Sequence, residues 1–322
     1  MDVGGTNLRY ALVRHAQQAS APVRQASKGL EIVRRDAVLT GDEEGRDAIM
    51  DRIIEATRTA SGWSNVKPVG VGLAMAGPTD PITGVMFRPP NIVPFDGFSP
   101  MAALVERLGV NAVTANDATM AALGEHRYGG HGKSDNLVYL TLSTGVGGGQ
   151  VVNGELYTGA GGFAGEWGHM TIDPNGPECN CGNRGDLESF CSGPGVTRMA
   201  RRMLEESNQE SVLRLTAPEA LTPKGIELIA RDGDALAKAI YEEAGRYLGI
   251  SVAGILSAVD PDVVVIGGGV SNALDLMMPS VERELSWRAM EQHRGRLPVV
   301  RAKLGDDSAL LGAAALALQA FS

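Results

Sequence analysis

Two cysteines, Cys179 and Cys181, and an aspartate, Asp186, lie close together in the segment ECNCGNRGDLESFC at residues 178–191. Asp186 stands where a third thiolate would complete a metal site, and Cys191 follows five residues later. Thiolates and carboxylates can both bind zinc. The segment is therefore a zinc site, a zinc site weakened by the loss of one thiolate, or a loop that binds no metal.

Three glycine-rich turns have the composition of phosphate-binding loops: DVGGTN at the start, STGVGGG near residue 146 and VIGGG before residue 270. Glycine lets backbone N–H groups approach an anion without an intervening Cβ, and a run of such groups binds phosphate oxygens. Thr6 and Thr144 add hydroxyl groups. Three such turns in one chain favour a nucleoside polyphosphate ligand over simple tight turns. A Rossmann dehydrogenase is a weak rival, because Asn272 stands at the third glycine position of the dinucleotide fingerprint.

The bulk composition excludes several classes of protein. With 322 residues and 43% apolar side chains, the chain is long enough for two domains. Three cysteines without a signal-peptide pattern indicate a reducing compartment, and we expect the cytoplasm. A formal charge of −9 without a basic run disfavours nucleic acid as a partner. The most apolar runs, 249–259 and 309–321, are shorter than the roughly 20 residues that a membrane span needs.

The motifs must be positioned by alternating strands and helices, which predicts an α/β architecture. DVGGTN and STGVGGG each lie between two expected strands, about one domain apart, so we expect two similar domains. We place the first at 1–114 together with the final helix in 306–322, and the second at 115–305. The strand before DVGGTN is unusually short for a hairpin: either the true start lies upstream or this strand is clipped.

The ordered motifs DVGGTN, AMAGP, AND, STGVGGG, GEWGH, CNCGNRGDLE and VIGGG resemble the ROK family of sugar kinases and sugar-responsive repressors. The resemblance extends from Asp2 to the last helix. It implies a two-domain actin-like or ribonuclease-H-like ATPase fold with ATP in an interdomain cleft, and a homodimer. Family repressors carry a DNA-binding helix-turn-helix before the first glycine loop, which here begins at residue 2. Family kinases keep the aspartate of the Asn116–Asp117 pair, so the kinase interpretation is favoured.

The resemblance assigns roles to individual residues. Asp117 would be the general base that accepts the proton of a sugar hydroxyl, although Asn and Asp at a strand-to-helix corner also cap helices. The sugar would be bound by Gly77, Asn91, Asn116, Asp117, Glu166, His169 and Glu188. Asp2 would act on Mg²⁺ directly or through water. The nucleotide would be bound by Gly4, Gly5, Thr6, Asn7, Thr144, Gly145, Gly147, Gly268 and Gly269. Many relatives carry lysine where this chain has Asn7.

His169, Cys179, Cys181 and Asp186 match the zinc site of the family, whose last ligand is normally cysteine. We expect structural zinc with Asp186 as fourth ligand in preference to Cys191; the alternative is that hydrogen bonds from Asp186 hold the loop without metal. The zinc would fix His169 and Glu188 against the sugar.

The simplest activity that the resemblance implies is phosphorylation of the 6-hydroxyl of glucose with ATP as donor. A kinase of N-acetylmannosamine, N-acetylglucosamine, fructose or mannose is the alternative, and a non-catalytic sensor of sugar and ATP is the alternative of another class. Polyphosphate as the donor is also possible, although the VIGGG loop favours ATP.

Overall fold

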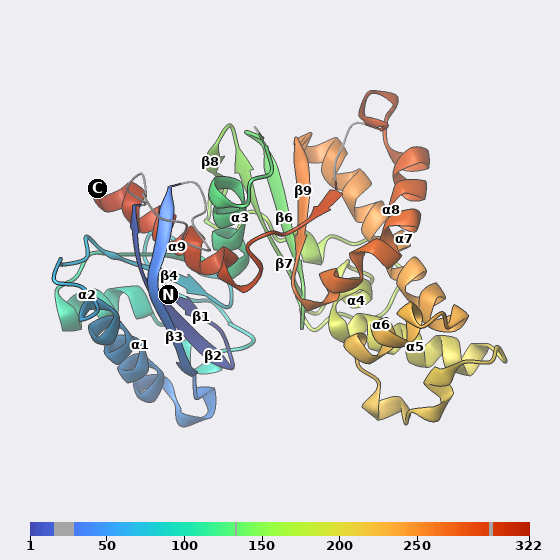
Figure 1. Ribbon diagram of the computed structural model, residues 1–322, viewed down its shortest axis with the longest axis horizontal. Helices are drawn as coiled ribbons and strands as arrows, with labels where there is room; N and C mark the ends of the chain where they lie inside the picture. Colours follow the sequence, from blue (N-terminus) through green and yellow to red (C-terminus); the bar gives the residue numbers. More distant parts are fainter. Residues whose placement is uncertain (16–28, 133, 296–298) are drawn as a thin grey trace. The chain divides into compact units, whose positions relative to one another are not determined.

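The computed structural model describes residues 1–15, 29–132, 134–295 and 299–322 (Figure 1). The chain forms two compact units. Unit 1 comprises Met1–Asp135, Gly149–Gly165 and Lys303–Ser322, and unit 2 comprises Asn136–Gly148 and Glu166–Ala302. Within the described ranges, every helix is too short or too polar to cross a bilayer.

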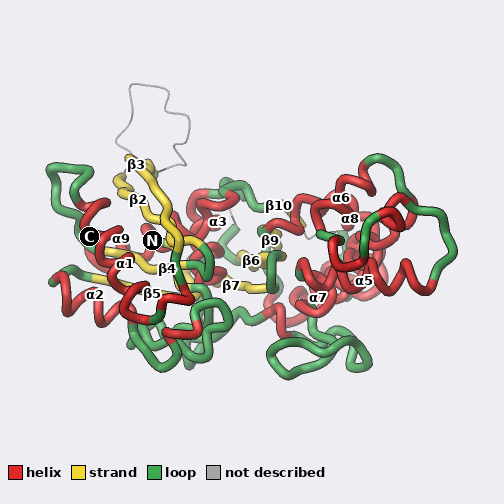
Figure 2. The backbone as a smooth tube through the Cα atoms, turned by 90° about the horizontal axis from the view of Figure 1, so that it is seen from below, coloured by secondary structure: helices red, strands yellow, loops and turns green. Residues whose placement is uncertain are grey.

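Unit 1 is built on a five-stranded sheet of order β3-β2-β1-β4-β5. The strands are β1 (Asp2–Val3), β2 (Asn7–His15), β3 (Leu30–Leu39), β4 (Val71–Met75) and β5 (Ala112–Asn116). β1 and β3 run antiparallel to β2, while β4 lies parallel to both β1 and β5. Figure 2 shows β2 and β3 side by side, and the two strands pair antiparallel.

The helices of unit 1 are α1 (Arg46–Ser61), α2 (Pro100–Leu108), α3 (Asp117–Tyr128) and α9 (Ser308–Phe321), with short 3-10 turns at Asp42–Glu44, Val93–Phe95 and Gly305–Asp307. α3 and α9 touch through glycines. A Cβ atom on Gly124 would lie 2.1 Å from the Ser308 carbonyl oxygen, and one on Gly312 would lie 1.7 Å from that of Met120. Because no larger side chain fits there, the two helices pack backbone against backbone.

The second sheet has the order β10-β9-β6-β7-β8 and belongs to unit 2, except for β8 and the part of β7 after Gly148, which fall in unit 1. Its strands are β6 (Leu137–Leu142), β7 (Val146–Val152), β8 (Glu155–Leu156), β9 (Val263–Gly267) and β10 (Val299–Arg301). The helices of unit 2 are α4 (Glu188–Cys191), α5 (Gly193–Glu206), α6 (Pro223–Arg231), α7 (Ala235–Val259) and α8 (Leu274–Arg288). Shorter 3-10 turns lie at Trp167–His169, Val212–Leu215, Pro218–Ala220, Gly269–Ala273 and Glu291–His293. Apolar side chains of β6, β9, α5, α7 and α8 form the core of this unit.

The α/β fold class expected from the sequence is confirmed by two sheets that are each combined with helices. The expected domain boundary at residue 115 differs from the compact units, because α3 packs on α9 and therefore lies in unit 1. The assignment of functional domains stays a prediction.

Candidate functional site

The Asn116–Asp117 pair lies at the corner where β5 ends and α3 begins. Asn116 caps the helix: its Oδ1 atom accepts hydrogen bonds from the N–H groups of Ala118 at 2.9 Å and Thr119 at 3.2 Å. Its Nδ2 group donates to the Gly77 carbonyl oxygen at 3.2 Å. Asp117 is half-buried in the first turn of α3, and its Oδ1 atom accepts from Ala118 N at 2.8 Å. The capping role is thus taken mainly by Asn116, and the positive end of the helix favours a negative charge on Asp117.

The first glycine loop lies against the segment that holds Asn91. A Cβ atom on Gly5 would lie 2.8 Å from the Asn91 carbonyl oxygen and 2.9 Å from the Asn91 Cβ. Gly77, with φ of 145°, approaches Pro89 in the same way, at 2.8 Å. Glycine is therefore required at both positions, by space at Gly5 and by space and backbone conformation at Gly77. Thr6 stays exposed beside this contact.

Two further features shape the first loop. Gly4 N–H donates to the Asn7 carbonyl oxygen at 2.9 Å, which closes the turn, and Asn7 is exposed. Asp2 is buried, and its Oδ2 atom lies 3.2 Å from Arg9 Nη1. Burial raises the pKa of Asp2, and the charge of Arg9 opposes that shift. Arg9 is a partner that the sequence patterns did not identify.

The second glycine loop, which holds Thr144, Gly145 and Gly147, is tied to Glu188. Ser143 N–H donates to the Gly145 carbonyl oxygen at 2.9 Å, and Val146 N–H donates to Glu188 Oε2 at 2.8 Å. A Cβ atom on Gly145 would lie 2.6 Å from the same oxygen. Glu188, expected as a sugar ligand, thus also fixes the backbone of the loop expected to bind phosphate.

The third glycine loop leaves the end of β9. Gly268 has φ of 82°, and a Cβ atom there would lie 2.3 Å from the Leu142 carbonyl oxygen. Gly269 is exposed, with no atom within 4 Å of its Cβ position. The close approach places Gly268 at the end of β6, the strand that leads into the second glycine loop.

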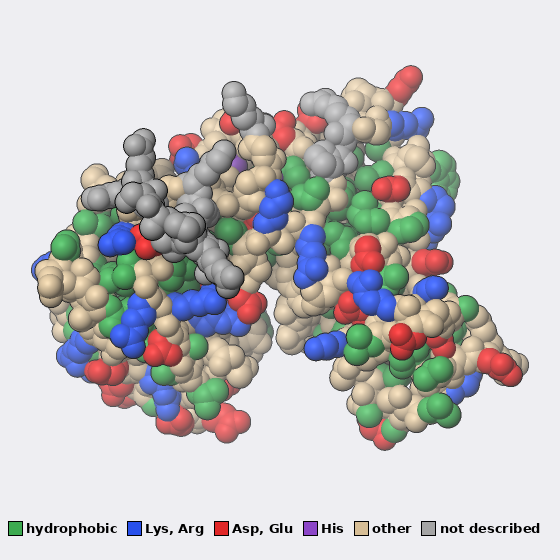
Figure 3. Space-filling view, viewed as in Figure 1, with side chains coloured by type: hydrophobic (Ala, Val, Ile, Leu, Met, Phe, Trp, Pro, Cys, Tyr) green, Lys and Arg blue, Asp and Glu red, His purple; other side chains and the backbone are tan. Residues whose placement is uncertain are grey.

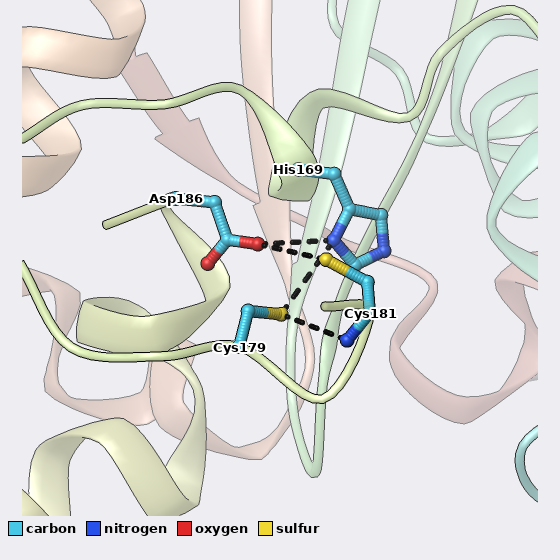
Figure 4. Close-up of side chains that lie close together, drawn as sticks. All are labelled: His169, Cys179, Cys181 and Asp186. Carbon is cyan, nitrogen blue, oxygen red and sulfur yellow. Dashed lines mark hydrogen bonds and ion pairs between the residues drawn. The ribbon is translucent and has the colours of Figure 1, made fainter. Parts of the chain in front are cut away.

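The side chains of His169, Cys179, Cys181 and Asp186 point toward one another (Figure 4). The His169 Nδ1 atom lies 3.2 Å from Asp186 Oδ2 and 3.9 Å from Cys179 Sγ. Cys181 Sγ lies 3.5 Å from Asp186 Oδ2, and all four ligand atoms are within 4.8 Å of one another. The spacing read from the sequence therefore corresponds to one cluster in space.

This cluster fits a tetrahedral zinc ion. With Zn–N and Zn–O bonds of about 2.1 Å and Zn–S bonds of about 2.3 Å, neighbouring ligand atoms around a tetrahedral ion lie roughly 3.3–3.8 Å apart. Three of the six pairwise separations, at 3.2, 3.5 and 3.9 Å, fall on or within 0.1 Å of that range, and the other three are no longer than 4.8 Å. The donor set of one imidazole, two thiols and one carboxylate is chemically allowed for zinc.

Cys191 lies outside the cluster. It is buried in α4, its Sγ atom donates to the Ala244 carbonyl oxygen at 3.3 Å, and burial raises the pKa of its thiol. A thiol held in this way does not reach the other ligands. Of the two candidates for the fourth ligand, Asp186 lies in the cluster and Cys191 does not.

The two carboxylate oxygens of Asp186 have different partners, a feature that the sequence analysis did not predict. Oδ1 accepts the Ser189 N–H at 3.0 Å and so fixes the start of α4, while Oδ2 faces the cluster. Aspartate is a preferred residue at helix starts, where its side chain accepts N–H groups of the first turn, so Asp186 just before α4 was a signal for this contact. Burial alone would raise the pKa of Asp186, but hydrogen bonds from Cys179, Ser189 and His169 outweigh it and lower that pKa.

Two more carboxylates border the cluster. Glu188 Oε1 accepts from Cys179 Sγ at 3.3 Å, and Glu166 Oε2 lies 4.0 Å from His169 Nε2. Partial burial raises the pKa of Glu166; the charge of His169 opposes this shift and that of Glu188 adds to it. His169 is therefore held on its Nδ1 side by the cluster and presents Nε2 toward Glu166.

Charged side chains on the face of the molecule in Figure 3 are interspersed in sign, without a continuous basic patch. This agrees with the acidic composition of the chain, whose formal charge is −9.

Comparison with known proteins places these motifs in a family. The family model described as "ROK family" matches residues 1–320. A glucokinase of Thermotoga maritima is 32% identical over 317 residues, covering 98% of this chain and 95% of that protein. The crystal structure of a ROK family glucokinase from Streptomyces griseus, in complex with glucose and AMPPNP, is 30% identical, covers 99% of this chain and 98% of that chain, and superimposes with a TM-score of 0.78.

Repressors are also similar to this chain: an N-acetylglucosamine repressor of Escherichia coli is 30% identical over 252 residues, which cover 78% of this chain and 61% of that protein. The full-length match to the family model and the superposition on a ROK glucokinase confirm the expected actin-like, ribonuclease-H-like fold. The chain belongs to the ROK family.

Proposed function

We propose that this protein is an ATP-dependent hexose kinase that transfers the γ-phosphoryl group of ATP to a sugar hydroxyl, with the 6-hydroxyl of glucose as the preferred acceptor. The observation that carries the proposal is the Asn116–Asp117 corner, where a capped helix start holds a carboxylate, in a chain similar to glucokinases over nearly its full length. Mg²⁺ accompanies ATP in such a reaction.

Asp117 acts as the general base in this proposal. Its carboxylate accepts the proton of the sugar hydroxyl as the hydroxyl oxygen forms a bond to the γ-phosphorus, and the bond from that phosphorus to the bridging oxygen of ADP breaks. Asn116 supports this role in two ways. It satisfies the first N–H groups of α3, and it donates to Gly77, so the side chain before the base is locked at both of its polar atoms.

The glycine loops bind the nucleotide. Gly4, Gly5, Thr6, Asn7, Thr144, Gly145 and Gly147 offer backbone N–H and hydroxyl groups to phosphates, and Gly268 and Gly269 bind the adenosine. Asp2, whose Oδ2 atom lies 3.2 Å from Arg9 Nη1, would supply a carboxylate to Mg²⁺ directly or through water.

The sugar is bound by carboxylate, amide and imidazole groups, which read hydroxyl groups at fixed geometry. The proposed ligands of the sugar are Gly77, Asn91, Asn116, Asp117, Glu166, His169 and Glu188. Zinc held by His169, Cys179, Cys181 and Asp186 would supply a structural cross-link. His169 and Glu188 both contact Cys179, so the cross-linked loop fixes their orientation.

The direct test is ADP production with Mg²⁺ and ATP and, in separate reactions, glucose, N-acetylmannosamine, N-acetylglucosamine, fructose and mannose. The proposal expects the highest kcat/KM for glucose. A higher kcat/KM for another hexose would replace glucose but keep the kinase, and polyphosphate is tested as a donor in the same assay. The elution volume of the same preparation on a sizing column tests the expected homodimer.

A non-catalytic sensor is the second candidate, favoured by the similarity to a repressor over 252 residues. The two functions differ in turnover. Sugar-dependent ADP release that disappears in the Asp117→Ala protein supports the kinase. Calorimetric binding of sugar and nucleotide without any ADP release supports the sensor and contradicts the kinase.

A further inference from the structure

Two aromatic side chains of unit 1, Phe87 and Phe163, contact each other although both are exposed. Their ring centroids lie 5.6 Å apart, and the ring planes meet at 78°. In such an edge-to-face pair the positive edge of one ring meets the negative face of the other, which is attractive beyond the area that the pair buries. The two residues remain 45% and 40% exposed. The contact therefore joins two surface segments that are far apart in the sequence.

The first of these segments, residues 77–96, directs the ring of Phe87 outward. The side chain before it, Met86, is fully buried, and the backbone of Met86 forms short bridges with Thr79 and Asp96. The N–H group of Phe87 donates to the Pro78 carbonyl oxygen at 2.9 Å. Because successive side chains of an extended chain point to opposite sides, the burial of Met86 turns Phe87 toward the surface.

The backbone directly after Phe87 is held in a conformation that side chains disfavour. Arg88 has φ of 42°, in the left-handed region, and its N–H group donates to Asp96 Oδ1 at 2.8 Å. A residue with a Cβ atom stays in this region only where its surroundings fix it, and such residues gather at sites that clamp ligands. Two prolines follow and restrict the chain up to Asn91, a proposed ligand of the sugar. The position of Phe87 is thus coupled to that of Asn91.

The second segment, residues 158–165, lies against the first at two neighbouring positions. Gly162 has φ of 85°, and a Cβ atom there would clash with the ring of Pro81. The next residue is Phe163, which contacts Phe87. The segment closes on itself through the Ala164 N–H, which donates to the Thr158 carbonyl oxygen at 2.9 Å. It leads directly into residue 166, the glutamate proposed to bind the sugar.

The first segment is also joined to the corner that holds the proposed general base. Asn116 Nδ2 donates to the Gly77 carbonyl oxygen at 3.2 Å, and the carbonyl oxygen of the following residue, Pro78, accepts the Phe87 N–H. A series of hydrogen bonds within unit 1 therefore leads from Asn116 to Phe87, and the ring contact continues it to Phe163. The segments on both sides of this contact carry proposed ligands of the sugar.

We propose that Phe87 and Phe163 are positioning residues for the sugar. Their contact, the aromatic clasp, holds segment 158–165 on segment 77–96, so that the ligands carried by the two segments are ordered before the sugar arrives. The inference rests on the proposed function for its sugar site, but it requires sugar binding and not turnover.

The clasp acts on sugar affinity through the population of the ordered arrangement. Without it, segment 158–165 spends part of its time in arrangements that do not bind the sugar. The apparent Kd rises as the competent fraction falls, because binding then includes the cost of ordering the segment. The nucleotide is bound in our proposal by the glycine loops, which the clasp does not include, so its affinity stays the same.

The test measures sugar and nucleotide Kd by calorimetry in the parent, Phe87→Ala, Phe163→Ala and the double variant. We expect each single substitution to raise the sugar Kd by about 3–10-fold, the range that corresponds to an aromatic pair, with the nucleotide Kd unchanged. The double variant should be no weaker than the weaker single variant, because either substitution removes the same contact. Phe163→Tyr keeps the ring and should restore the parent Kd. Trp287→Ala, which removes an exposed ring from α8, is the control and should bind sugar as the parent does.

Amide hydrogen exchange without any ligand tests the clasp separately from sugar binding. The Ala164 N–H should exchange faster in Phe87→Ala, although the substitution lies on the other segment, and should be unchanged in Trp287→Ala. Unchanged exchange at Ala164, an unchanged sugar Kd in both single variants, or additive increases in the double variant would overturn the positioning role and leave the proposed kinase in place. A parent protein that binds none of the five sugars would overturn the proposed function, and the positioning role with it.

Discussion

At the scale of single residues, a substitution of Asp117, the proposed general base, should affect catalysis and sugar binding to different extents. We predict that Asp117→Asn lowers kcat by about 10²–10⁴-fold, the usual contribution of a general base, while the sugar Kd changes only a few-fold because the amide keeps the shape of the side chain. Glu106→Gln, which changes an exposed carboxylate on α2, is the control and should leave kcat unchanged. Coupled ADP assays and calorimetry measure both effects. A variant with nearly full kcat would remove Asp117 from the mechanism.

A second residue-scale prediction concerns the two oxygens of Asp186. Asp186→Cys should bind zinc more tightly, because a third thiolate is a softer ligand. It should also lose about 1–3 kcal/mol of stability in the metal-free state, since the Ser189 N–H loses its acceptor. Asp186→Asn keeps an acceptor for Ser189 but weakens the metal site. Zinc content after dialysis and urea unfolding with and without chelator check the predictions; equal zinc content in all three proteins would contradict a role for Asp186 as ligand.

At the scale of elements, α3 is fixed by a buried carboxylate that the sequence patterns did not single out. Glu125 is fully buried and accepts hydrogen bonds from Lys303 N at 3.1 Å, Leu304 N at 2.9 Å and Ser308 Oγ at 2.8 Å, with His131 Nε2 at 2.6 Å. Burial alone would raise its pKa, but these hydrogen bonds, that of His131 first, outweigh burial and lower it. Glu125 therefore joins α3 to the segment that leads into α9.

We predict that Glu125→Ala destabilises unit 1 by about 3–5 kcal/mol, because it leaves several buried donors without an acceptor. Glu125→Gln should cost less. Because the folded-state pKa is depressed, the stabilisation by the carboxylate is fully present above the unfolded pKa of about 4.3 and is lost as the pH falls through the lower folded pKa. The difference in unfolding free energy between the parent and Glu125→Gln should therefore shrink in acid. Urea unfolding at pH 7 and pH 3.5 measures it, and a pH-independent difference would show that charge is not the cause.

At the scale of the whole molecule, each compact unit has its own core, so a change in one need not loosen the other. If zinc cross-links the loop of unit 2, chelation should speed amide exchange in residues 166–191 and leave β1, β2 and α1 unchanged. Hydrogen exchange of the metal-loaded and chelated protein measures this. Loss of protection across both units would point to global unfolding rather than to release of a local cross-link.

The sequence alone determined the family, the α/β class and the four members of the His-Cys-Cys-Asp cluster, because ordered glycine turns and ligand types are local features of the chain. Which of Asp186 and Cys191 joins the cluster depends on the packing of α4 against α7, because that packing sets the direction of the two side chains. The packing of α3 on α9 likewise depends on the tertiary structure, because it rests on close backbone contacts at Gly124 and Gly312, which lie far apart in the sequence. The contact of Glu188 with the second glycine loop and those of Glu125 with Lys303, Leu304 and Ser308 are likewise long-range, and no local pattern encodes them. Arg9, in contrast, lies opposite Asp2 in the β1–β2 pairing.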